Sequence, residues 1–219
     1  KVVSRLQASG HTTIAIDLPG MGADGTDLGS VTLASWNNAL VEVIQAQEEP
    51  VVLVGHSRGG LNISMAAETI PDQIAKLIYL CAFVPSNGES LTDSAARDHR
   101  SNLRSALIPA ADGTSITVRQ SALKDTFYGD CSDEDLTLAK LCLKPEPTVI
   151  LASPFEGTDA RFGRVSKTYI ECLQDQAISI DRQREMAALC DQVVTMDVSH
   201  SPFFSAPDEL TEALLRLAA

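Results

Sequence analysis

The sequence predicts a mostly parallel α/β sheet flanked by helices, and three observations support this prediction. Short apolar runs rich in Val and Ile alternate with longer segments of helical periodicity. The run at 51–54 is apolar throughout, as expected for a strand that is buried on both faces of a parallel sheet. A glycine-rich turn and a helical segment follow it directly. Strands that alternate with helices are typical of parallel sheets.

Size and charge narrow the classes of function. The chain has 219 residues, which favours one domain, and a formal net charge of −12, which argues against nucleic acid or an anionic membrane surface as a partner. No apolar run is long enough to span a bilayer. The five cysteines are odd in number and lack metal-ligand spacing, so we expect reduced thiols, no metal and no cofactor. We therefore expect a cytoplasmic protein, either a monomer or a homodimer.

The first 50 residues predict a helix, a strand and a second helix. A short helix is expected to end at Gly10, and a strand is expected over 11–17. A glycine-rich loop continues to about residue 30, and Thr32 is the expected N-cap of a helix that reaches about residue 47. Because the chain opens within a helix, we expect the amino-terminal strands of the sheet to be missing from this sequence.

An insertion interrupts the alternation of strands and helices. The chain from 86 to 165 is more polar than its flanks and carries several prolines. Helical patterns near 90–104 and 133–143 predict a helical cap in this insertion. We expect one structural domain, in which 1–85 and 166–219 form the core.

The sheet pattern continues on both sides of this insertion. Before it, a helix is expected at 61–69 and a strand at 74–82. The expected elements after it are a strand at 168–172, a helix at 182–189, a strand at 192–196 and a helix at 207–217. Ligand sites of such sheets lie at the carboxyl ends of the strands, which directs attention to the residues that follow each strand.

The motif Gly-His-Ser-Arg-Gly at 55–59 is the strongest functional signal. It lies between the strand at 51–54 and a helix, which is the context that a nucleophile elbow requires. Gly55 and Gly59 have no Cβ atoms, so strand and helix are expected to approach closely around Ser57. The neighbouring helix N-terminus favours developing negative charge. The alternative is an ordinary turn with an idle serine, whereas a phosphate-binding loop is excluded because its Gly-Lys-Ser/Thr ending is absent.

A serine nucleophile needs a neighbouring base, and His200 is the expected one. It follows the last predicted strand, so its loop would share the carboxyl edge of the sheet with Ser57. His56 is expected to be a packed or hydrogen-bonded structural residue whose side chain points away from the hydroxyl. His11 is expected to be exposed at a helix–strand corner, and His99 to be solvated in the insertion. An ordinary loop histidine is the alternative for residue 200.

The acid that orients the base is expected to be Asp175. It stands just beyond the strand at 168–172, and the order Ser, acid, His is the one expected for this kind of elbow. Glu171 is a competitor, but it lies within the strand. Asp197 belongs to the same strand end as His200 and cannot easily reach around the ring. Two further aspartates are expected on the surface: Asp181 and Asp191.

Other residues are expected around the triad. The backbone N–H of Arg58 is the expected first oxyanion donor, whereas its side chain is expected to form a surface salt bridge. Cys81 ends the strand beside the elbow strand, so it is expected near the site, as a buried and inert thiol. Apolar pocket walls are expected from aromatic residues, although core packing explains each one equally well. The candidates are Phe83 and Phe203, with Phe127 and Phe155 after them.

Several stretches of the chain resemble one family of enzymes. They are Ser-Gly-His at 9–11, Asp-Leu-Pro-Gly at 17–20, the strand and turn at 51–60, Leu-Cys-Ala-Phe-Val-Pro at 80–85, Tyr-Ile-Glu-Cys at 169–172 with Asp-Gln-Ala-Ile at 175–178, and Ser-His-Ser-Pro-Phe at 199–203. The chain resembles the α/β-hydrolases of the plant methylesterase and hydroxynitrile lyase family, and more closely their bacterial relatives of the EstC and pyrethroid-hydrolase type. The resemblance implies a hydrolase core with a helical cap, and it places Ser57, Asp175 and His200 on the triad positions.

The chain also departs from this family in three places. The family's amino-terminal strand and its His-Gly oxyanion segment have no counterpart in these residues. Lyases of the family carry a lysine directly after the triad histidine, where this chain has Ser201, which disfavours a lyase. Arg58 replaces an apolar residue that is common in the plant members, so plant-hormone substrates are not assumed.

The residues together predict a serine carboxylesterase that uses no cofactor. His200 would take the proton of Ser57 as the hydroxyl attacks a small-molecule ester with hydrophobic groups, and an acyl-enzyme would then be hydrolysed. The alternative is a ligand-binding or receptor-like protein that keeps the hydrolase fold with little turnover, since a fold does not decide a function.

Overall fold

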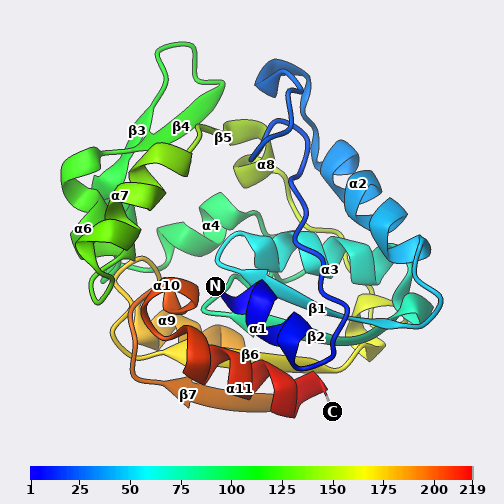
Figure 1. Cartoon of the computed structure of the whole chain (residues 1–219). Helices are drawn as coiled ribbons and strands as arrows, with labels where there is room; N and C mark the ends of the chain where they lie inside the picture. The colour runs from blue at the N-terminus through cyan, green and yellow to red at the C-terminus, as the bar shows by residue number, and fades with distance from the viewer. Residues whose placement is uncertain (219) are drawn as a thin grey trace.

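The computed structural model describes residues 1–218, and its centre is a four-stranded parallel sheet with the order β1-β2-β6-β7 (Figure 1). The strands are β1 (Val51–His56), β2 (Ile74–Leu80), β6 (Lys167–Cys172) and β7 (Gln192–Met196). All three pairings between them are parallel. The predicted parallel sheet is therefore confirmed, and each of these strands lies within two residues of its expected position.

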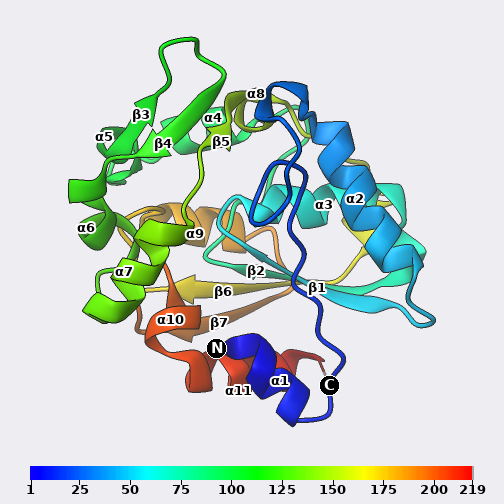
Figure 2. The same cartoon turned by 45° about the horizontal axis from the view of Figure 1, so that its top comes forward.

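Helices cover both faces of this sheet (Figure 2). On one face lie α2 (Leu33–Gln45), α3 (Gly59–Thr69) and α9 (Ile180–Ala187), and on the other lie α1 (Val2–Ala8) and α11 (Pro207–Ala218). The sequence builds both layers through the alternation of side chains along a strand. In β2, Leu77 and Tyr79 join one buried cluster, whereas Ile78 and Leu80 join the cluster on the opposite face.

The second helix begins where its sequence predicts. The Thr32 hydroxyl accepts a hydrogen bond from the backbone N–H of Ser35, and the Ser35 hydroxyl accepts one from the N–H of Thr32. Two otherwise unpaired donors of the helix start are satisfied in this way. Trp36 then packs against the sheet and is only 1% exposed. The predicted N-cap is confirmed.

The strand expected over 11–17 does not form. This segment belongs to no ladder, and β1 pairs only with β2 within residues 1–218. Residues 10–16 and 50–55 instead line one cavity, and Ile14 and Val54 are 53% and 44% exposed. A strand needs a neighbour for its N–H and C=O groups, and apolar periodicity alone does not supply one. That explains why this prediction was wrong.

The segment 86–165 contains a second, smaller sheet in addition to helices. Its strands β3 (Leu107–Pro109), β4 (Ser115–Val118) and β5 (Glu146–Pro147) pair in an antiparallel manner. The sequence did not predict this sheet, because strands of two to four residues are too short to show a period of two. The helical part of the prediction fits in outline, although the helix expected at 90–104 is split into α4 (Leu91–Ala96) and α5 (Leu103–Ala106). The division at 86 and 165 stays a prediction.

The remaining helices are short. They are α6 (Leu123–Phe127), α7 (Asp133–Cys142), α8 (Thr148–Ala152), α10 (Pro202–Ser205) and four 3₁₀ turns at Leu28–Ser30, Pro71–Gln73, Gln120–Ala122 and Phe162–Arg164. Across residues 1–218, none of the helices has both the length and the apolar character that crossing a membrane requires.

The start of α3 approaches the chain that follows β2 very closely. A Cβ atom built on Gly60 would lie 2.0 Å from the carbonyl oxygen of Phe83, whereas one built on Gly59 would meet nothing within 4 Å. A backbone oxygen cannot move away from an added Cβ as easily as the end of a flexible side chain can. Gly60, rather than the Gly59 of the motif, is thus the glycine that allows helix and sheet to meet.

We expect Gly60→Ala to lower the free energy of unfolding by at least about 1–3 kcal/mol, the usual cost of overpacking. Gly59→Ala, its matched control, should stay within about 0.5 kcal/mol of the wild type because space is open there. Urea unfolding followed by circular dichroism measures both values. Equal stabilities for the two variants would contradict the close approach.

Candidate active site

Ser57 occupies a strained turn between β1 and α3. Its φ of +52° lies in the left-handed region, which residues with a Cβ adopt at a cost. Its own N–H donates to the Leu80 carbonyl at 3.2 Å, and its carbonyl accepts from Gly60 and Phe83 at 3.2 and 3.0 Å. These bonds hold the backbone in its strained form. The serine side chain lines the cavity at the carboxyl edge of the sheet.

Two glycines make this turn possible. A Cβ on Gly55 would lie 2.6 Å from the carbonyl oxygen of Gly59, and the contact of Gly60 with Phe83 is closer still. The expectation that Gly55 allows a close approach therefore holds. Gly59 contributes its backbone oxygen to the tight contact, although its own Cα has open space around it.

His200 and Asp175 form a buried hydrogen bond of 2.7 Å between Nδ1 and Oδ2. Both residues are almost completely buried, at 1% and 3% exposure. An ionised carboxylate only accepts, so a neutral His200 carries its proton on Nδ1 and leaves Nε2 as an acceptor. The cavity that His200 lines also reaches Ser57, whose hydroxyl forms no hydrogen bond within residues 1–218.

The Asp175 carboxylate accepts four hydrogen bonds within residues 1–218. Its Oδ1 accepts from the backbone N–H groups of Ala177 and Ile178 at 2.7 and 3.0 Å, and its Oδ2 accepts from the Gln183 amide at 3.2 Å as well as from His200. Such donors orient a carboxylate and occupy its acceptor positions. The contribution of Gln183 was missed, because a polar residue on a predicted helix gives no signal that it points inward.

The competing acids are engaged elsewhere. Glu171 pairs with Arg184 and accepts from Thr195, and Asp197 accepts from Gln174. Of the two aspartates expected on the surface, Asp181 forms a salt bridge with Arg100, and Asp191 accepts a hydrogen bond from the backbone N–H of Lys167. None of these four carboxylates bonds to His200 within residues 1–218, so Asp175 is the acid that the fold brings to the histidine.

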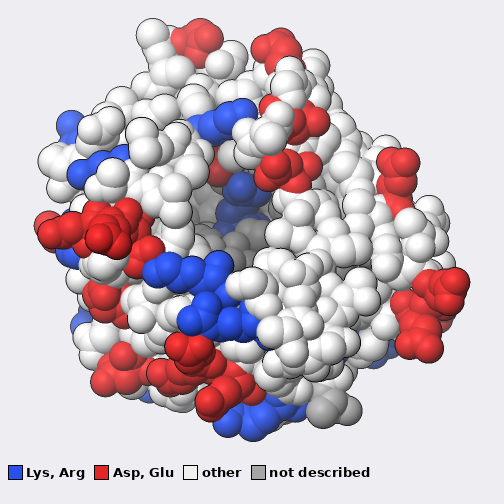
Figure 3. All heavy atoms as spheres, in the orientation of Figure 1, with Lys and Arg blue, Asp and Glu red and all other residues white. Residues whose placement is uncertain are grey.

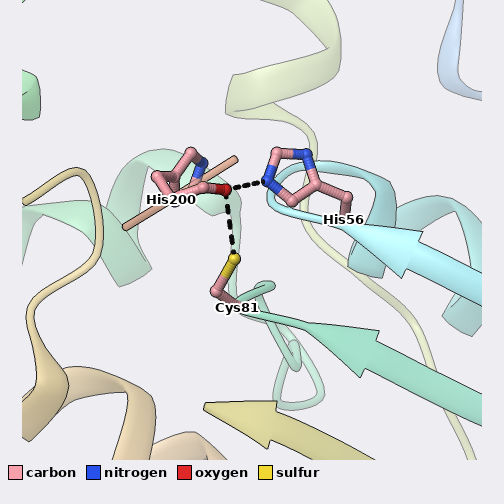
Figure 4. Close-up of side chains that lie close together, drawn as sticks. All are labelled: His56, Cys81 and His200. Carbon is pink, nitrogen blue, oxygen red and sulfur yellow. Dashed lines mark hydrogen bonds between the residues drawn. The ribbon is translucent and has the colours of Figure 1, made fainter. Parts of the chain in front are cut away.

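A second histidine and a thiol hold the backbone of His200 (Figure 4). His56 and His200 are linked by a bond of 2.7 Å between the His56 Nε2 and the His200 carbonyl oxygen, and the Cys81 thiol donates to the same oxygen at 3.4 Å. A carbonyl oxygen only accepts, so His56 carries its proton on Nε2. The expectation of a hydrogen-bonded structural His56 fits this contact. Its partner was not foreseen, because the pairing depends on two loops that are distant in sequence.

His56 and Cys81, which together form a clamp on the His200 carbonyl oxygen, are both kept neutral by their surroundings. Burial, with the nearby His200 and Arg58 as further causes, lowers the pKa of His56 to about 3. Burial also raises the pKa of the Cys81 thiol well above its usual value. The two side chains and His200 could offer ligand atoms within 4.8 Å of one another. A neutral thiol and a protonated Nε2 that already share a carbonyl oxygen suit a hydrogen-bonded clamp better than a metal site.

The cavity at the site measures about 1870 Å³. Phe83 and Phe203 line it, as does Phe127, whose ring packs edge-on against His200 at 5.5 Å between centroids. Phe155 lies apart from it, buried against Phe162 in the core. The volume exceeds the usual 300–1,000 Å³ of a small-molecule pocket, because the same cavity continues along the open edge of β1.

Arg58 faces this cavity in two ways. Its backbone N–H makes no hydrogen bond within residues 1–218, so the donor expected at the oxyanion is unused by the fold. Its side chain was expected to form a salt bridge on the surface. The salt bridge is present, but it lies on the cavity instead of the outer surface. The guanidinium pairs at 2.7 Å with Glu146 of β5, and both side chains lie half-buried on the cavity.

The family can be stated from the whole chain. The family model described as "Alpha/beta hydrolase family" matches residues 1–213. The chain belongs to this family. The predicted fold, with its parallel sheet flanked by helices, is that of this hydrolase.

Curated relatives of this hydrolase include plant methylesterases. Putative methylesterase 14, chloroplastic, of Arabidopsis thaliana is 30% identical over 233 residues, which cover 100% of this chain and 67% of the relative. Salicylic acid-binding protein 2 of Nicotiana tabacum is 30% identical over 238 residues, with 100% and 90% covered. The hydrolase spans from about half to nine-tenths of the length of the curated relatives that it matches.

Solved structures agree with these relatives. Polyneuridine aldehyde esterase superposes with a TM-score of 0.90 at 26% identity, over 100% of this chain and 92% of that one. A pyrethroid hydrolase from Sphingobium faniae gives a TM-score of 0.87 at 29% identity, over 99% and 90%. The predicted resemblance to both groups is confirmed, and the predicted class, a carboxylic ester hydrolase, agrees with both comparisons.

The low pKa of His56 makes stability depend on pH. Between pH 6.5 and about 3 the unfolded chain binds a proton at this residue that the folded chain does not, so stability falls as the pH is lowered through that window. We expect His56→Gln to flatten the fall, by up to about 1.4 kcal/mol per pH unit. Urea unfolding at pH 7 and pH 4.5 measures the slope. The exposed His11→Gln is the control, and a slope unchanged in His56→Gln would refute the assignment.

Cys81 is expected to be inert in the folded protein. Burial and its raised pKa leave almost no thiolate, whereas Cys142 is exposed. Iodoacetamide should therefore alkylate native protein at Cys142 and spare Cys81, and both should react in urea. Peptide mass mapping reads the two sites. Native modification of Cys81 at the rate of Cys142 would show that the clamp opens to solvent.

Proposed function

We propose that this hydrolase is a serine carboxylesterase in which Ser57, His200 and Asp175 act as a catalytic triad. The observation that carries the proposal is the buried 2.7 Å bond between His200 and Asp175, on a cavity that also reaches Ser57. This bond leaves Nε2 of the imidazole as an acceptor that faces no competing partner within residues 1–218. A base of this kind is what a serine nucleophile needs.

The reaction has two halves. As the Ser57 oxygen forms its bond to the ester carbonyl carbon, Nε2 of His200 takes the hydroxyl proton. The C–O bond to the alcohol then breaks, and the imidazolium gives the same proton to the departing alkoxide. Water repeats the cycle on the acyl-enzyme and releases the acid. The ionised Asp175 stabilises the imidazolium in both halves without taking its proton.

Backbone dipoles are the expected stabilisers of the oxyanion. The unused N–H of Arg58 follows the nucleophile directly, at the position where such donors lie in this family. The amino-terminus of α3 begins one residue later and adds its positive dipole end. A preorganised donor of this kind accelerates acyl transfer by about 10²–10³-fold.

The walls of the cavity favour esters with hydrophobic groups. Phe83, Phe127 and Phe203 line the cavity that Ser57 and His200 share, and the Phe127 ring packs against His200. Apolar walls with a small number of polar anchors are typical of small-molecule sites. A substrate of this kind is a small ester that enters between the core and the 86–165 segment.

A ligand-binding protein with little turnover is the second candidate. One relative, at 30% identity, is named a salicylic acid-binding protein, and the Ser57 hydroxyl is not hydrogen-bonded to His200. Apo enzymes often show such long contacts, which tighten only with substrate. Turnover by the wild type is therefore the decisive measurement.

Hydrolysis of 4-nitrophenyl butyrate tests the proposal. We expect Ser57→Ala to lower kcat by at least about 10³-fold and Asp175→Asn to lower it by about 10⁴-fold, because the variant imidazole adopts the wrong tautomer. Asp197→Asn is the matched control, since within residues 1–218 that exposed carboxylate bonds only to Gln174, and it should keep activity within about twofold.

A fluorophosphonate should label the wild type at Ser57, as read by peptide mass mapping. Equal rates for wild type and Ser57→Ala would reject the esterase. Labelling at another serine would reassign the nucleophile.

A further inference from the structure

The residue after the nucleophile links the core to the small sheet of the 86–165 segment. The Arg58 guanidinium contacts both carboxylate oxygens of Glu146, at 2.7 Å from Nε and 3.1 Å from Nη2. The Nη2 contact is a hydrogen bond, whereas the Nε contact is an ion pair without hydrogen-bond geometry, and together they hold the guanidinium against the carboxylate. Glu146 pairs with Ile116 in the register of β4 and β5, so the salt bridge reaches from the elbow directly to that sheet.

A flat aromatic platform holds the same guanidinium. The Arg58 Cζ lies 4.5 Å from the centroid of the Trp36 ring. Trp36 is itself fixed, since its indole N–H donates to the Pro19 carbonyl at 2.8 Å and its side chain is buried. Stacking on an indole is favourable for an arginine and restricts its rotamers. The Arg58 side chain is therefore positioned by two groups, the Trp36 ring and the Glu146 carboxylate, which an ordinary surface arginine lacks.

The ion pair sets the charge beside the nucleophile. Arg58, Arg104 and Lys144 line the cavity, and Figure 3 shows Lys and Arg atoms within and beside the central hollow, whereas Asp and Glu atoms form separate patches around it. Among the acids on the cavity wall, Asp98 already accepts from two backbone N–H groups. Two further acids, Glu48 and Glu49, precede β1, whereas Ser57 follows the other end of that strand. Glu146 is thus the carboxylate that compensates Arg58.

We propose that the Arg58–Glu146 pair makes the site select neutral esters over esters that carry a carboxylate. This inference rests on the proposed esterase function and names its substrate class. A substrate carboxylate near the elbow would meet the negative charge of Glu146, and it could bind Arg58 only by displacing Glu146 from the ion pair. A neutral ester meets a compensated wall and breaks nothing. Arg58 and Glu146 are then specificity-determining residues, which act on binding rather than on the transfer of the proton.

Two chromogenic esters of similar length test this inference. They are 4-nitrophenyl hexanoate and mono-4-nitrophenyl adipate, which differ by a terminal carboxylate. We expect the wild type to favour the hexanoate by at least tenfold in kcat/KM. Glu146→Gln, which keeps the shape and removes the charge, should cut that ratio at least tenfold, mainly through a lower KM for the adipate. Arg58→Gln should raise the ratio, because it leaves Glu146 uncompensated and keeps the backbone N–H.

Controls separate charge from cap movement. Asp181→Asn removes another ion pair, the exposed contact with Arg100 that joins the 86–165 segment to α9, and it should leave the ratio unchanged. The double variant Arg58→Gln/Glu146→Gln should lie between the two single variants. A wild type that prefers the adipate, or a Glu146→Gln variant that changes both substrates equally, would overturn the inference.

Failure of the esterase proposal would look different. If the wild type hydrolyses neither ester and Ser57 is not labelled, calorimetric titration with hexanoate and adipate replaces the kinetics. The two acids should then still be distinguished. Adipate should bind at least tenfold more tightly to Glu146→Gln than to the wild type. Hexanoate has one carboxylate where adipate has two, so its affinity should increase less. Equal gains for both acids would reject charge selection at Arg58 independently of turnover.

Discussion

The buried hydrogen bond between His200 and Asp175 is the interaction on which the site depends, and the topology of the sheet creates it. Asp175 follows β6 and His200 follows β7, and these strands are neighbours that end in register at Cys172 and Met196. The backbone bonding continues beyond both strand ends, since Leu173 and Gln174 donate to Met196 and Val198 at 3.0 Å. These backbone bonds hold the two loops side by side, so the positions of Asp175 and His200 are close together because of the backbone alone.

Strain at the neighbouring strand ends completes the same edge. Ser57 and Cys81 are the two non-glycine residues with positive φ within residues 1–218, and each follows one of the paired strands β1 and β2. Each such residue costs about 1–3 kcal/mol. The N–H of Ser57 donates to Leu80 and the N–H of Cys81 donates to Ile170, so the ladder itself holds both turns. The thiol of Cys81 then reaches the His200 carbonyl and connects the strained edge to the base.

Much of this arrangement follows from local signals in the sequence. The order of Ser57, Asp175 and His200, each just beyond an apolar run, predicted which residues would gather at one edge. The Thr32 cap was equally readable, because it depends on residues within one turn. Contacts between distant segments gave no such signal. The clamp of His56 on His200 and the pairing of Arg58 with Glu146 depend on how separate loops pack, and the absent ladder at 11–17 depends on a neighbour that periodicity does not reveal.

In the proposed esterase, Arg58 would serve catalysis and selectivity through two separate groups, its backbone N–H and its side chain. Its backbone N–H is the proposed oxyanion donor, and that donor belongs to the turn whatever side chain is attached. Its side chain leaves in another direction, across Trp36 to the second sheet. A change of side chain therefore alters the charge of the wall and its link to β5 without removing the donor. In the proposed mechanism proton transfer and oxyanion binding use the histidine and the backbone, so a change of this side chain should shift substrate preference at little cost to the chemical step.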